Sequence, residues 1–382
     1  MRSHTKLAFL GDRSPREFLA RHWQRRALHV KQAIPDWQGL FKPRDLLELA
    51  YYPECRSRLV LREGKRWRVE TGPFKRGRLR ALGTRNWALL VQDVNLVSPA
   101  AQDLLMRFNF IPYARMDDLM VSLAPEGGGV GPHFDSYDVF LLQGSGRRRW
   151  ALSTQKDLSL VRDAPLRLLK NFQPGDTYTV DGGDMLYLPP KVAHDGVALE
   201  ECMTYSIGFR APRLQELLSG FLAHLDDESQ LDGLYEDPDL LPTASPARIP
   251  AAMIATTHDL CRRSDYSKAS IERFLGKFLT DLQPHVRFSG PDLPLTLKQF
   301  SVAVMRHGIE LDLRTRMLRG TREIFINGEP VAIDAATRAT VRALSDRRAL
   351  PPGSSLGSPL LGMCYQWYRA GYLLLGNTRP EN

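Results

Sequence analysis

The feature that most constrains the fold is a dense series of short β-type segments in the middle of the chain. From about residue 118 to residue 209, short apolar runs alternate with turns that contain glycine or proline. The expected strands are 118–123, 139–142, 149–152, 177–180, 184–188 and 204–209. Many short strands at such spacing are typical of a β-sandwich or a jelly-roll barrel. The sequence therefore predicts a barrel of this kind as the central domain.

Helical patterns lie on both sides of this region. Ser14, Pro15 and Glu17 have the order of a helix N-terminus, because Ser caps, Pro suits the first turn and Glu reaches back. Apolar residues at 214–222 recur at a spacing that forms one stripe of a helix. A further helix is expected at 271–282, so a helical unit follows the barrel.

The C-terminal part combines helix and hairpin signals. Residues 297–305 and 361–372 have helical patterns, and Asn327-Gly328 between apolar residues is a strong hairpin signal. The stretch 236–250 is rich in Pro, Asp and Ser and is interpreted as a loop. We therefore expect an α+β protein with a barrel domain over 1–212, a helical region over 213–285 and a winged-helix-like domain over 286–382.

Composition limits the compartment and the partners. The formal net charge of +9 favours contact with polyanions such as RNA, but it also fits an ordinary solvated surface, so direct nucleic-acid binding stays open. No apolar run approaches the roughly 20 residues of a membrane span, and the N-terminus lacks the apolar segment of a secretion signal. The four cysteines are scattered without a Cys-x-x-Cys pair. We expect a cytoplasmic protein with reduced thiols and no membrane association.

One block has the pattern of a metal site. A glycine-rich entry leads into His133-Phe-Asp135, and side chains two apart on an extended segment project to the same side. His194 follows Leu-Pro-Pro, a rigid strand end that can direct a third ligand across the barrel. Two histidines and one carboxylate bind iron(II) on one face and leave three positions open. His-x-Asp alone is common by chance, so the prediction of His133, Asp135 and His194 as catalytic metal ligands depends on the whole combination.

A basic strand follows this block. The open positions of such an iron admit dioxygen and a bidentate keto acid, whose distal carboxylate suits the planar fork of an arginine. Strand alternation puts Arg148 on the apolar, inward side with Trp150, and it puts Arg147 and Arg149 on the opposite side. Arg148 is therefore the predicted anchor of the co-substrate carboxylate.

Several blocks of the chain resemble a known family. MDDLMVS, GGGVGPHFDSYDVFLLQGSGRRRW, LYLPPKVAHDG and YSIGFRAPRLQELLSGF are similar to segments of the bacterial JmjC-type ribosomal oxygenases. The resemblance implies a cupin-like JmjC barrel (a double-stranded β-helix), a helical dimerisation region and a C-terminal winged helix. By motif, His133, Asp135 and His194 match the iron ligands of the family, and Arg148 matches its 2-oxoglutarate anchor.

The resemblance also implies a reaction. With iron(II), 2-oxoglutarate and O2, such an enzyme adds a hydroxyl group to the β-carbon of an arginine in protein sixteen of the large ribosomal subunit, and it works as a homodimer. Asp118 is then the predicted partner of the arginyl guanidinium, although an exposed carboxylate that aids solubility has the same pattern. Tyr137 is predicted to line the substrate pocket, or else to pack in the core. Ser122, with Met120 beside it, is predicted to contact the co-substrate, or else to be a buried hydroxyl bonded to backbone.

Other functions fit parts of the pattern. A JmjC lysyl demethylase or histidyl hydroxylase would use the same iron chemistry on another side chain. A non-catalytic ribosome- or RNA-binding protein would use the basic surface, but it would not need the His, Asp and Arg set. A basic protein target would be attracted poorly by a basic enzyme unless acidic residues line the cleft, and Asp117, Asp118, Asp135 and Asp138 are the candidates.

Overall fold

The structure, a computed structural model, describes residues 4–229, 234–238, 240, 242 and 246–376. The chain divides into two compact units. The first contains residues 1–211 together with 284–287 and 312–314, and the second contains the rest. The expected loop at 236–250 lies partly outside the described residues. Among the helices that the structure describes, none is long and apolar enough to span a bilayer.

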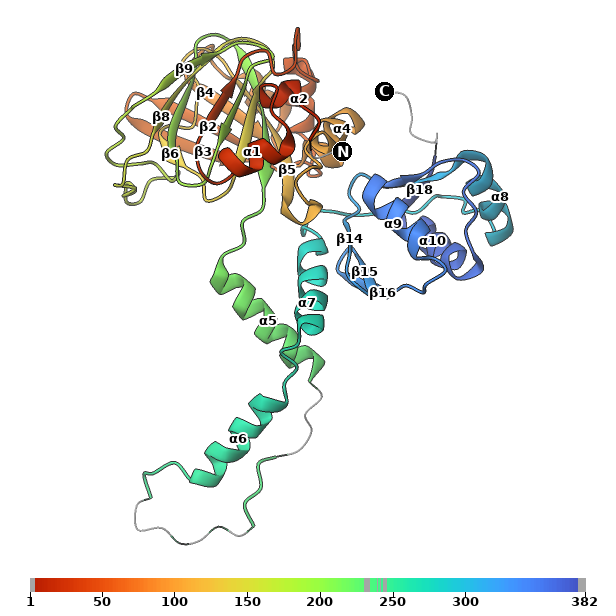
Figure 1. Ribbon diagram of the computed structural model, residues 1–382. Helices are drawn as coiled ribbons and strands as arrows, with labels where there is room; N and C mark the ends of the chain where they lie inside the picture. Colours follow the sequence, from red (N-terminus) through yellow and green to blue (C-terminus); the bar gives the residue numbers. More distant parts are fainter. Residues whose placement is uncertain (1–3, 230–233, 239, 241, 243–245, 377–382) are drawn as a thin grey trace. The chain divides into compact units, whose positions relative to one another are not determined.

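Two antiparallel sheets form the jelly roll of the first unit (Figure 1). The larger sheet has the spatial order β1 (Leu28–Val30), β10 (Met185–Leu188), β7 (Val139–Gln143), β12 (Cys202–Phe209), β5 (Met116–Ala124), β4 (Trp87–Val91), β2 (Ser57–Glu63) and β3 (Arg66–Thr71). The smaller sheet has the order β6 (His133–Phe134), β11 (Ala193–Ala198), β8 (Arg148–Ser153) and β9 (Thr177–Val180). All six strands expected from the sequence are present, within two residues at either end.

Helices cover the outer face of the larger sheet. These elements are η1 (Ala8–Leu10), α1 (Pro15–Arg21), α2 (Pro43–Leu49), α3 (Arg76–Arg80), η2 (Val94–Leu96), α4 (Pro99–Met106) and η3 (Tyr113–Arg115). The α1 helix has the expected capping box, with Ser14 accepting from the Glu17 backbone and Glu17 accepting from Ser14. Phe18 of α1 and Leu46 of α2 pack with strand residues such as Tyr205 in one large core. This core fixes the sheet whose other face carries the site.

The inner faces of the two sheets pack against each other in two smaller clusters. In one, Leu141 and Leu188 of the larger sheet contact Trp150 and Leu152 of the smaller sheet. In the other, residues of β2, β4 and β5 pack with Ala198 of β11. Strand alternation explains both clusters, because every second residue of each strand points into the barrel.

The second unit begins with three helices, α5 (Leu214–Glu228), α6 (Ala251–Arg263) and α7 (Lys268–Thr280). Phe221 and Leu225 of α5 pack on Phe274 of α7 in a small core. Leu214 and Leu218 belong to the same predicted stripe, but they are 84% and 54% exposed. The stripe is therefore only partly covered within one chain.

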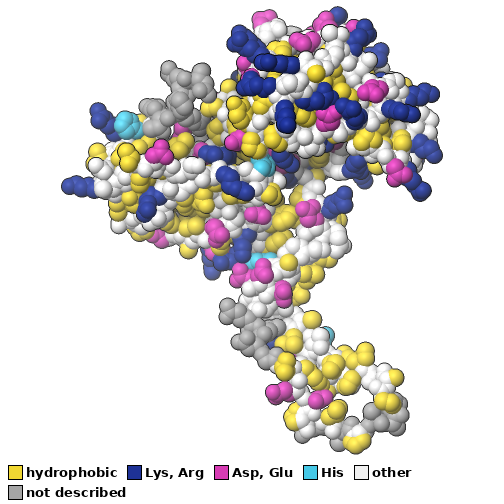
Figure 2. Space-filling view, turned by 180° about the vertical axis from the view of Figure 1, so that it is seen from behind, with side chains coloured by type: hydrophobic (Ala, Val, Ile, Leu, Met, Phe, Trp, Pro, Cys, Tyr) yellow, Lys and Arg dark blue, Asp and Glu magenta, His cyan; other side chains and the backbone are white. Residues whose placement is uncertain are grey.

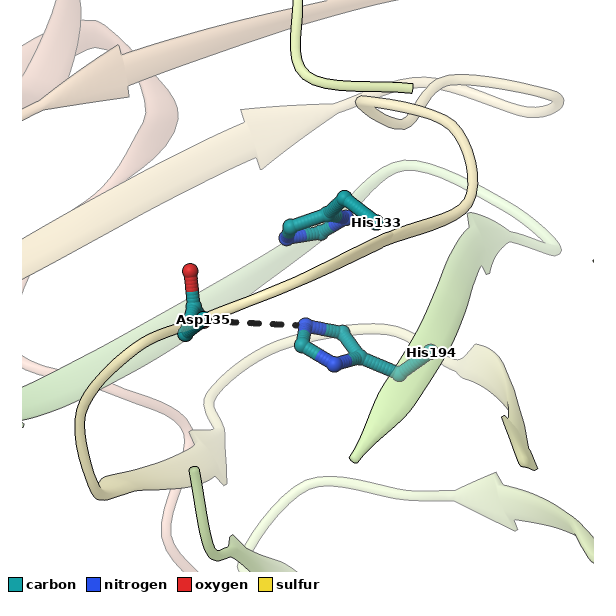
Figure 3. Close-up of side chains that lie close together, drawn as sticks. All are labelled: His133, Asp135 and His194. Atoms are coloured by element: carbon teal, nitrogen blue, oxygen red, sulfur yellow. Dashed lines mark ion pairs between the residues drawn. The ribbon is translucent and has the colours of Figure 1, made fainter. Parts of the chain in front are cut away.

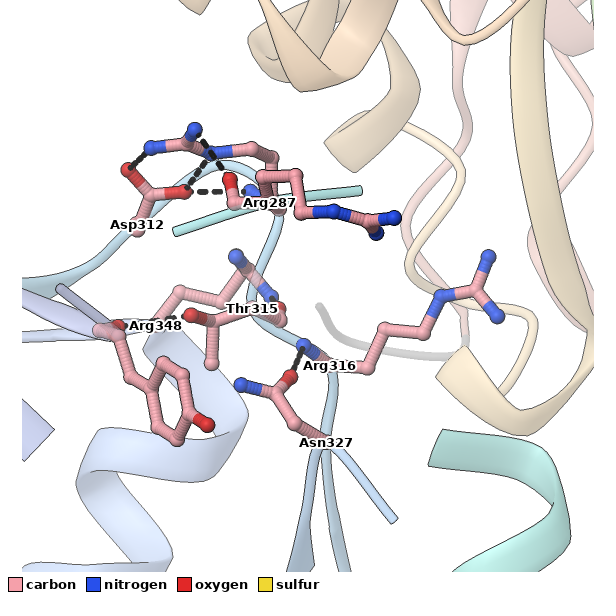
Figure 4. Close-up of polar contacts among 8 residues, drawn as sticks. Arg287, Asp312, Thr315, Arg316, Asn327 and Arg348 are labelled. Atoms are coloured by element: carbon pink, nitrogen blue, oxygen red, sulfur yellow. Dashed lines mark hydrogen bonds and ion pairs between the residues drawn. The ribbon is translucent and has the colours of Figure 1, made fainter. Parts of the chain in front are cut away.

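A small mixed domain completes the second unit. It contains α8 (Leu297–His307), β13 (Ile309–Leu311), β14 (Met317–Arg319), β15 (Glu323–Ile326), β16 (Glu329–Ala332), α9 (Arg338–Arg347), β17 (Ala349–Leu350), α10 (Ser358–Ala370) and β18 (Leu373–Leu375). The expected hairpin turn is present, with positive φ at both Asn327 and Gly328. Asn327 accepts a hydrogen bond from the backbone of Arg316, and the side chain of Arg348 donates to the carbonyl of Thr315 (Figure 4). These bonds tie the hairpin to the rest of the small domain.

Candidate metal centre and active site

The structure brings the three predicted metal ligands together. His133 on β6 lies directly opposite His194 on β11 in the strand register, and Asp135 follows the end of β6. One ligand atom from each residue lies within 4.8 Å of the other two (Figure 3). The His194 Nε2 atom is 3.8 Å from Asp135 Oδ2, and the two imidazole ring centres are 4.2 Å apart. The three donors converge on one point, which is the spacing that a shared ion requires.

Backbone carbonyls orient both imidazoles. The Nδ1 atom of His133 is 2.8 Å from the carbonyl oxygen of Gly131, and that of His194 is 2.9 Å from the carbonyl oxygen of Val192. Each Nδ1 therefore carries the proton and donates it, which leaves the Nε2 lone pair for a metal. Burial and, to a smaller extent, the nearby His133 together lower the pKa of His194 to about 4. His194 is therefore a neutral imidazole at physiological pH, as metal ligation requires.

His194 differs in one respect from the expectation. The sequence placed it at the end of the strand that finishes at Leu188, whereas the structure puts it on a separate strand, β11, after a turn at 189–192. The carbonyl that orients its ring belongs to Val192 in this turn. The Pro-Pro pair ends β10 and starts the turn, so His194 is held by pairing with both β6 and β8.

The glycine-rich entry is needed for close packing. Gly131 has a φ of +77°, and a Cβ atom there would lie 2.7 Å from Leu168 and 2.8 Å from the ring of Trp67. Any other residue would push the loop away from these side chains and displace the carbonyl that orients His133. Gly196 on β11 has a similar role, because the ring of Trp150 occupies the space where its side chain would be.

Arg148 lies inside the barrel on the same face as His194. In the pairing of β8 with β11, Arg148 is opposite Ala198 and Leu152 is opposite His194. Since residues two or four apart share a face, the guanidinium and the imidazole are both directed inward. Arg148 is only 4% exposed. Its Nε and Nη2 atoms have no hydrogen-bond partner among the described residues, and neither does the indole nitrogen of Trp150.

Two buried guanidinium nitrogens without a partner among the described residues are the pattern of a site that binds an anion. Leaving a buried charge without a partner costs several kcal/mol, so proteins keep such a group only where a ligand completes it. The alpha carbons of residues 194 and 198 lie about 13 Å apart along an extended strand. The long side chain of Arg148 shortens this gap, so a five-carbon dicarboxylate held at the metal donors would reach toward the guanidinium. The site therefore fits both iron(II), through its two nitrogen donors and one oxygen donor, and 2-oxoglutarate.

Acidic residues surround Tyr137, which lies two residues after the metal ligand Asp135. Asp118 is half-buried on β5, and burial together with Asp117 and Asp93 raises the pKa of its carboxyl to about 7. Tyr137 is 41% exposed, but burial around its hydroxyl raises the pKa of the phenol, and the charges of Asp135 and Asp118 add to the effect. The phenol therefore lies within electrostatic reach of both a metal ligand and Asp118.

The inner face of the larger sheet is polar around β5 and β12, and only part of this polar surface was predicted from the sequence. Met120 and Ser122 are inward-facing on β5, as expected, and Ser122 is buried. The structure adds Thr204, which pairs with Ser122 across β12 and donates from its hydroxyl to the buried Gln143 at 2.9 Å. Ser206 is a second buried hydroxyl two residues further on. The polar alternation in Thr204-Tyr-Ser206 is the signal that would have identified them.

Asp138 does not belong to the acidic pocket. Asp138 was predicted from the sequence to be one of the cleft acids, but it is fully buried and accepts a 2.6 Å hydrogen bond from the Tyr187 hydroxyl. Gln24 donates to its other oxygen at 3.0 Å, and Arg115 is 3.5 Å away. Asp138 is a structural anchor that fixes the strand after the metal loop.

The fold and the site together define a JmjC oxygenase. The family model for the JmjC domain matches residues 103–217, and the model for the ROXA-like winged helix matches residues 258–374. The first match contains all three predicted ligands and Arg148. The second covers most of the C-terminal unit. The chain is therefore an iron(II)- and 2-oxoglutarate-dependent dioxygenase with a jelly-roll catalytic domain and a winged-helix domain.

Comparison with similar proteins narrows the assignment from JmjC oxygenases in general to one group of them. A protein of Escherichia coli K12 named ribosomal protein uL16 3-hydroxylase is 34% identical over 93% of this chain and 96% of its own length. The structure of E. coli YcfD, a ribosomal oxygenase, in complex with cobalt and 2-oxoglutarate superposes with a TM-score of 0.81 at 32% identity, over 94% of this chain and 97% of that one. The bifunctional lysine-specific demethylase and histidyl-hydroxylase NO66 of Dictyostelium discoideum is 36% identical over only 20% of this chain and 16% of its own. This chain belongs to the bacterial JmjC-type ribosomal oxygenases.

Proposed function

We propose that this protein hydroxylates the β-carbon of an arginine in the large-subunit ribosomal protein uL16. The observation that carries the proposal is the presence, in one jelly-roll unit, of three converging metal donors together with two groups that recognise opposite charges. Arg148 supplies an unpaired cation inside the barrel, and Asp118 supplies a carboxyl group beside Tyr137. The E. coli relative is named for hydroxylation of ribosomal protein uL16. The family resemblance implies an arginine as the target, and an arginine would suit the second group.

We assign the co-substrate contacts as follows. His133, Asp135 and His194 would hold iron(II), and Arg148 would bind the distal carboxylate of 2-oxoglutarate with Ser122 and Met120 beside it. When bound, iron and 2-oxoglutarate reduce O2, so that one oxygen atom enters succinate and the other becomes the hydroxyl of the product, with release of carbon dioxide. The apolar residues around Trp150 exclude water from this side of the pocket.

The substrate guanidinium is assigned to Asp118. An ion pair there would hold the end of the arginine, and the methylene groups of its side chain would then lie between Asp118 and the metal donors. Asp118 also accepts a 3.3 Å hydrogen bond from the backbone of Asp93, which fixes the direction of the carboxyl group. Tyr137 would form one wall of the arginine pocket. Asp118 and Tyr137 would mainly position the substrate arginine and would not act as an acid or a base.

Mass spectrometry of a uL16 peptide tests this function. The peptide is incubated with the full-length protein, iron(II) and 2-oxoglutarate, with His133→Ala as the control. Addition of one oxygen atom to an arginine, absent in the control, is the expected result, and fragmentation locates it on the β-carbon. Succinate release without peptide oxidation would refute the substrate. Oxidation of a histidine or demethylation of a lysine would instead support the activities named for the NO66 relative.

A homodimer through α5 is part of the same proposal. Leu214, Leu218 and Leu222 form the uncovered side of the predicted stripe, and they are 84%, 54% and 48% exposed. A second copy of this helix would cover them, because an isologous contact joins the same patch on both subunits. Light scattering with size exclusion should give a dimer for the native protein and a monomer for Leu218→Glu, and a native monomer would refute the dimer. The cytoplasmic location expected from the sequence stays a prediction.

A further inference from the structure

The positive charge of this protein is concentrated in one short segment. Residues 56–85 contain eleven lysine and arginine residues and two glutamates, which give a net charge of +9. The whole chain also has a formal net charge of +9, so the remaining 352 residues are neutral in sum. A uniform solvated surface would spread the excess over the chain. This clustering of positive charge in residues 56–85 indicates that the charges have a local function.

The segment forms one edge of the jelly roll. β2 and β3 make a hairpin, β3 is the outermost strand of the larger sheet, and α3 follows directly. Six exposed side chains of the hairpin and α3 define what we call the basic edge: Lys65, Arg66, Arg68, Lys75, Arg76 and Arg80. In the space-filling view, Lys and Arg side chains are dense over the jelly-roll unit (Figure 2). The six side chains of the basic edge are therefore part of the exposed surface of this unit.

Few acidic groups neutralise the basic edge. Arg68 and Arg78 share Glu70, and Arg76 forms a bidentate pair with Glu48 at 2.6 Å for both bonds. Within the described chain, no ion pair is present for Lys65, Arg66, Lys75 or Arg80. Like charges on neighbouring residues repel one another, so a bound polyanion would lower the electrostatic energy of this surface.

The basic edge lies beside the metal loop. Trp67 of β3 points to the inner side of the hairpin, and its ring occupies the space next to Gly131. The carbonyl of Gly131 is the group that orients His133. A ligand that follows the hairpin would therefore pass close to the loop that carries the metal donors.

We propose that the basic edge binds RNA through its phosphate backbone. Nine of the eleven cations in the segment are arginines, whose planar fork pairs with two phosphate oxygens. An aromatic surface lies next to them, because Arg76 lies over the ring of Tyr51 at 4.7 Å and the adjacent Tyr52 is 53% exposed. Such rings can stack with unpaired bases. The edge has no long amphipathic helix of the kind that enters a membrane surface, since α3 has only five residues.

This inference goes beyond hydroxylation and does not depend on it. The basic edge uses none of the proposed metal, co-substrate or arginine contacts, so RNA binding can be measured without turnover. It would also remove the charge mismatch between a basic enzyme and a basic target, because a target associated with RNA would be attracted through the RNA.

Fluorescence anisotropy with the full-length protein tests the proposal. The probe is a fluorescein-labelled RNA hairpin of about 20 nucleotides with a single-stranded tail, titrated at several salt concentrations. The edge variant combines Lys65→Gln, Arg66→Gln and Arg80→Gln, which are exposed and break no ion pair of the described chain. The control combines Arg262→Gln, Lys298→Gln and Arg306→Gln, three exposed helical positions with the same total charge change.

We expect the native protein to bind the RNA and the edge variant to bind at least about tenfold more weakly at 0.15 M salt. The slope of log Kd against log salt should become shallower by about 2, since three phosphate contacts contribute roughly 0.7 to 0.9 each. The Kd of the control variant for the RNA should stay within about threefold of that of the native protein. The proposal is overturned if the native protein does not bind RNA at 50 mM salt, or if both variants weaken equally. It is also overturned if phosphatidylserine vesicles bind as tightly per phosphate as the RNA.

Discussion

Arg148→Met should have opposite effects on the stability of the protein without 2-oxoglutarate and on that of its complex with 2-oxoglutarate. Methionine removes the charge but keeps a long side chain beside Trp150. In the native protein the Arg148 Nε and Nη2 atoms are buried, and no residue that the structure describes forms a hydrogen bond with them. An unsatisfied buried group costs about 1–3 kcal/mol, so the variant should be more stable by a similar amount when no ligand is present. For a domain of this size, each kcal/mol raises Tm by about 2–4 °C.

The complex should respond in the other direction. Two hydrogen bonds from a guanidinium to a carboxylate contribute about 1.5–3 kcal/mol each, or about 3–6 kcal/mol together. Loss of that energy weakens 2-oxoglutarate binding by about 10²- to 10⁴-fold. At a ligand concentration about 100 times the native Kd, the native protein gains roughly 2.7 kcal/mol of stability, and the variant should gain almost none.

Thermal unfolding with and without 2-oxoglutarate measures both effects in one assay. Manganese(II) replaces iron(II) so that no turnover occurs. Arg149→Met is the matched control, because Arg149 is adjacent on β8 but exposed on the opposite face. It should leave both Tm values nearly unchanged. An Arg148→Met protein that keeps the 2-oxoglutarate shift, or that is destabilised without ligand, would show that Arg148 has another partner and that our reasoning is wrong.

Three further results are expected. His133→Ala should weaken cobalt(II) binding more than about 100-fold in an optical titration, whereas His224→Ala in the helical region should not; unchanged binding in the first variant would refute the metal site. Since the pKa of Asp118 is raised to about 7, its carboxyl is neutral below that pH, so KM for an arginine peptide should rise as the pH falls through 7, and Asp118→Asn should have a high KM without this dependence. The folded protein binds the Asp118 proton more tightly than the unfolded chain does, because the pKa of Asp118 is about 7 in the fold and 3.8 in the unfolded chain. Stability contributed by the protonated carboxyl is therefore lost as the pH rises from about 4 to about 7. Asp118→Asn should thus raise Tm more at pH 8 than at pH 4. Tyr187→Phe removes a 2.6 Å bond to the buried Asp138 and should lower the free energy of unfolding by about 2–3 kcal/mol in urea, and a loss below about 0.5 kcal/mol would contradict that role.

Much of the fold follows from local sequence patterns. The alternation in Met116–Ala124 and Cys202–Phe209 predicts strands because every second residue is apolar and faces the large core. Asn327-Gly328 predicts a hairpin because both residues tolerate positive φ. The strand β11 was not predicted. Its sequence, AHDGVA, has no β-branched alternation, and it becomes a strand only because β6 and β8 flank it.

The site was predictable to the extent that it depends on spacing along the chain. His133 and Asp135 are two residues apart, and Arg148 follows from the alternation of one strand. His194 was predicted from the Leu-Pro-Pro strand end before it, but its position opposite His133 could not be, because that position depends on pairing between distant strands. Thr204 and Gln143 were missed for the same reason, since their hydrogen bond joins residues 61 apart. Asp138 was misassigned because only the fold shows that Tyr187 and Gln24 enclose it.

The carboxyl group of Asp118 and the basic edge attract charged ligands over different distances. At physiological salt, the field of an exposed charge decays over about 8 Å, whereas a buried charge is screened much less. Asp118 is half-buried, so its attraction acts only on a cation that has already entered the pocket. The basic edge is exposed, and its charges add, so it acts on an approaching polyanion before contact. A target that carries an arginine next to an RNA segment would meet the edge first and the acidic pocket second. This order predicts that raising the salt concentration should slow turnover of an RNA-associated target more than turnover of the free peptide.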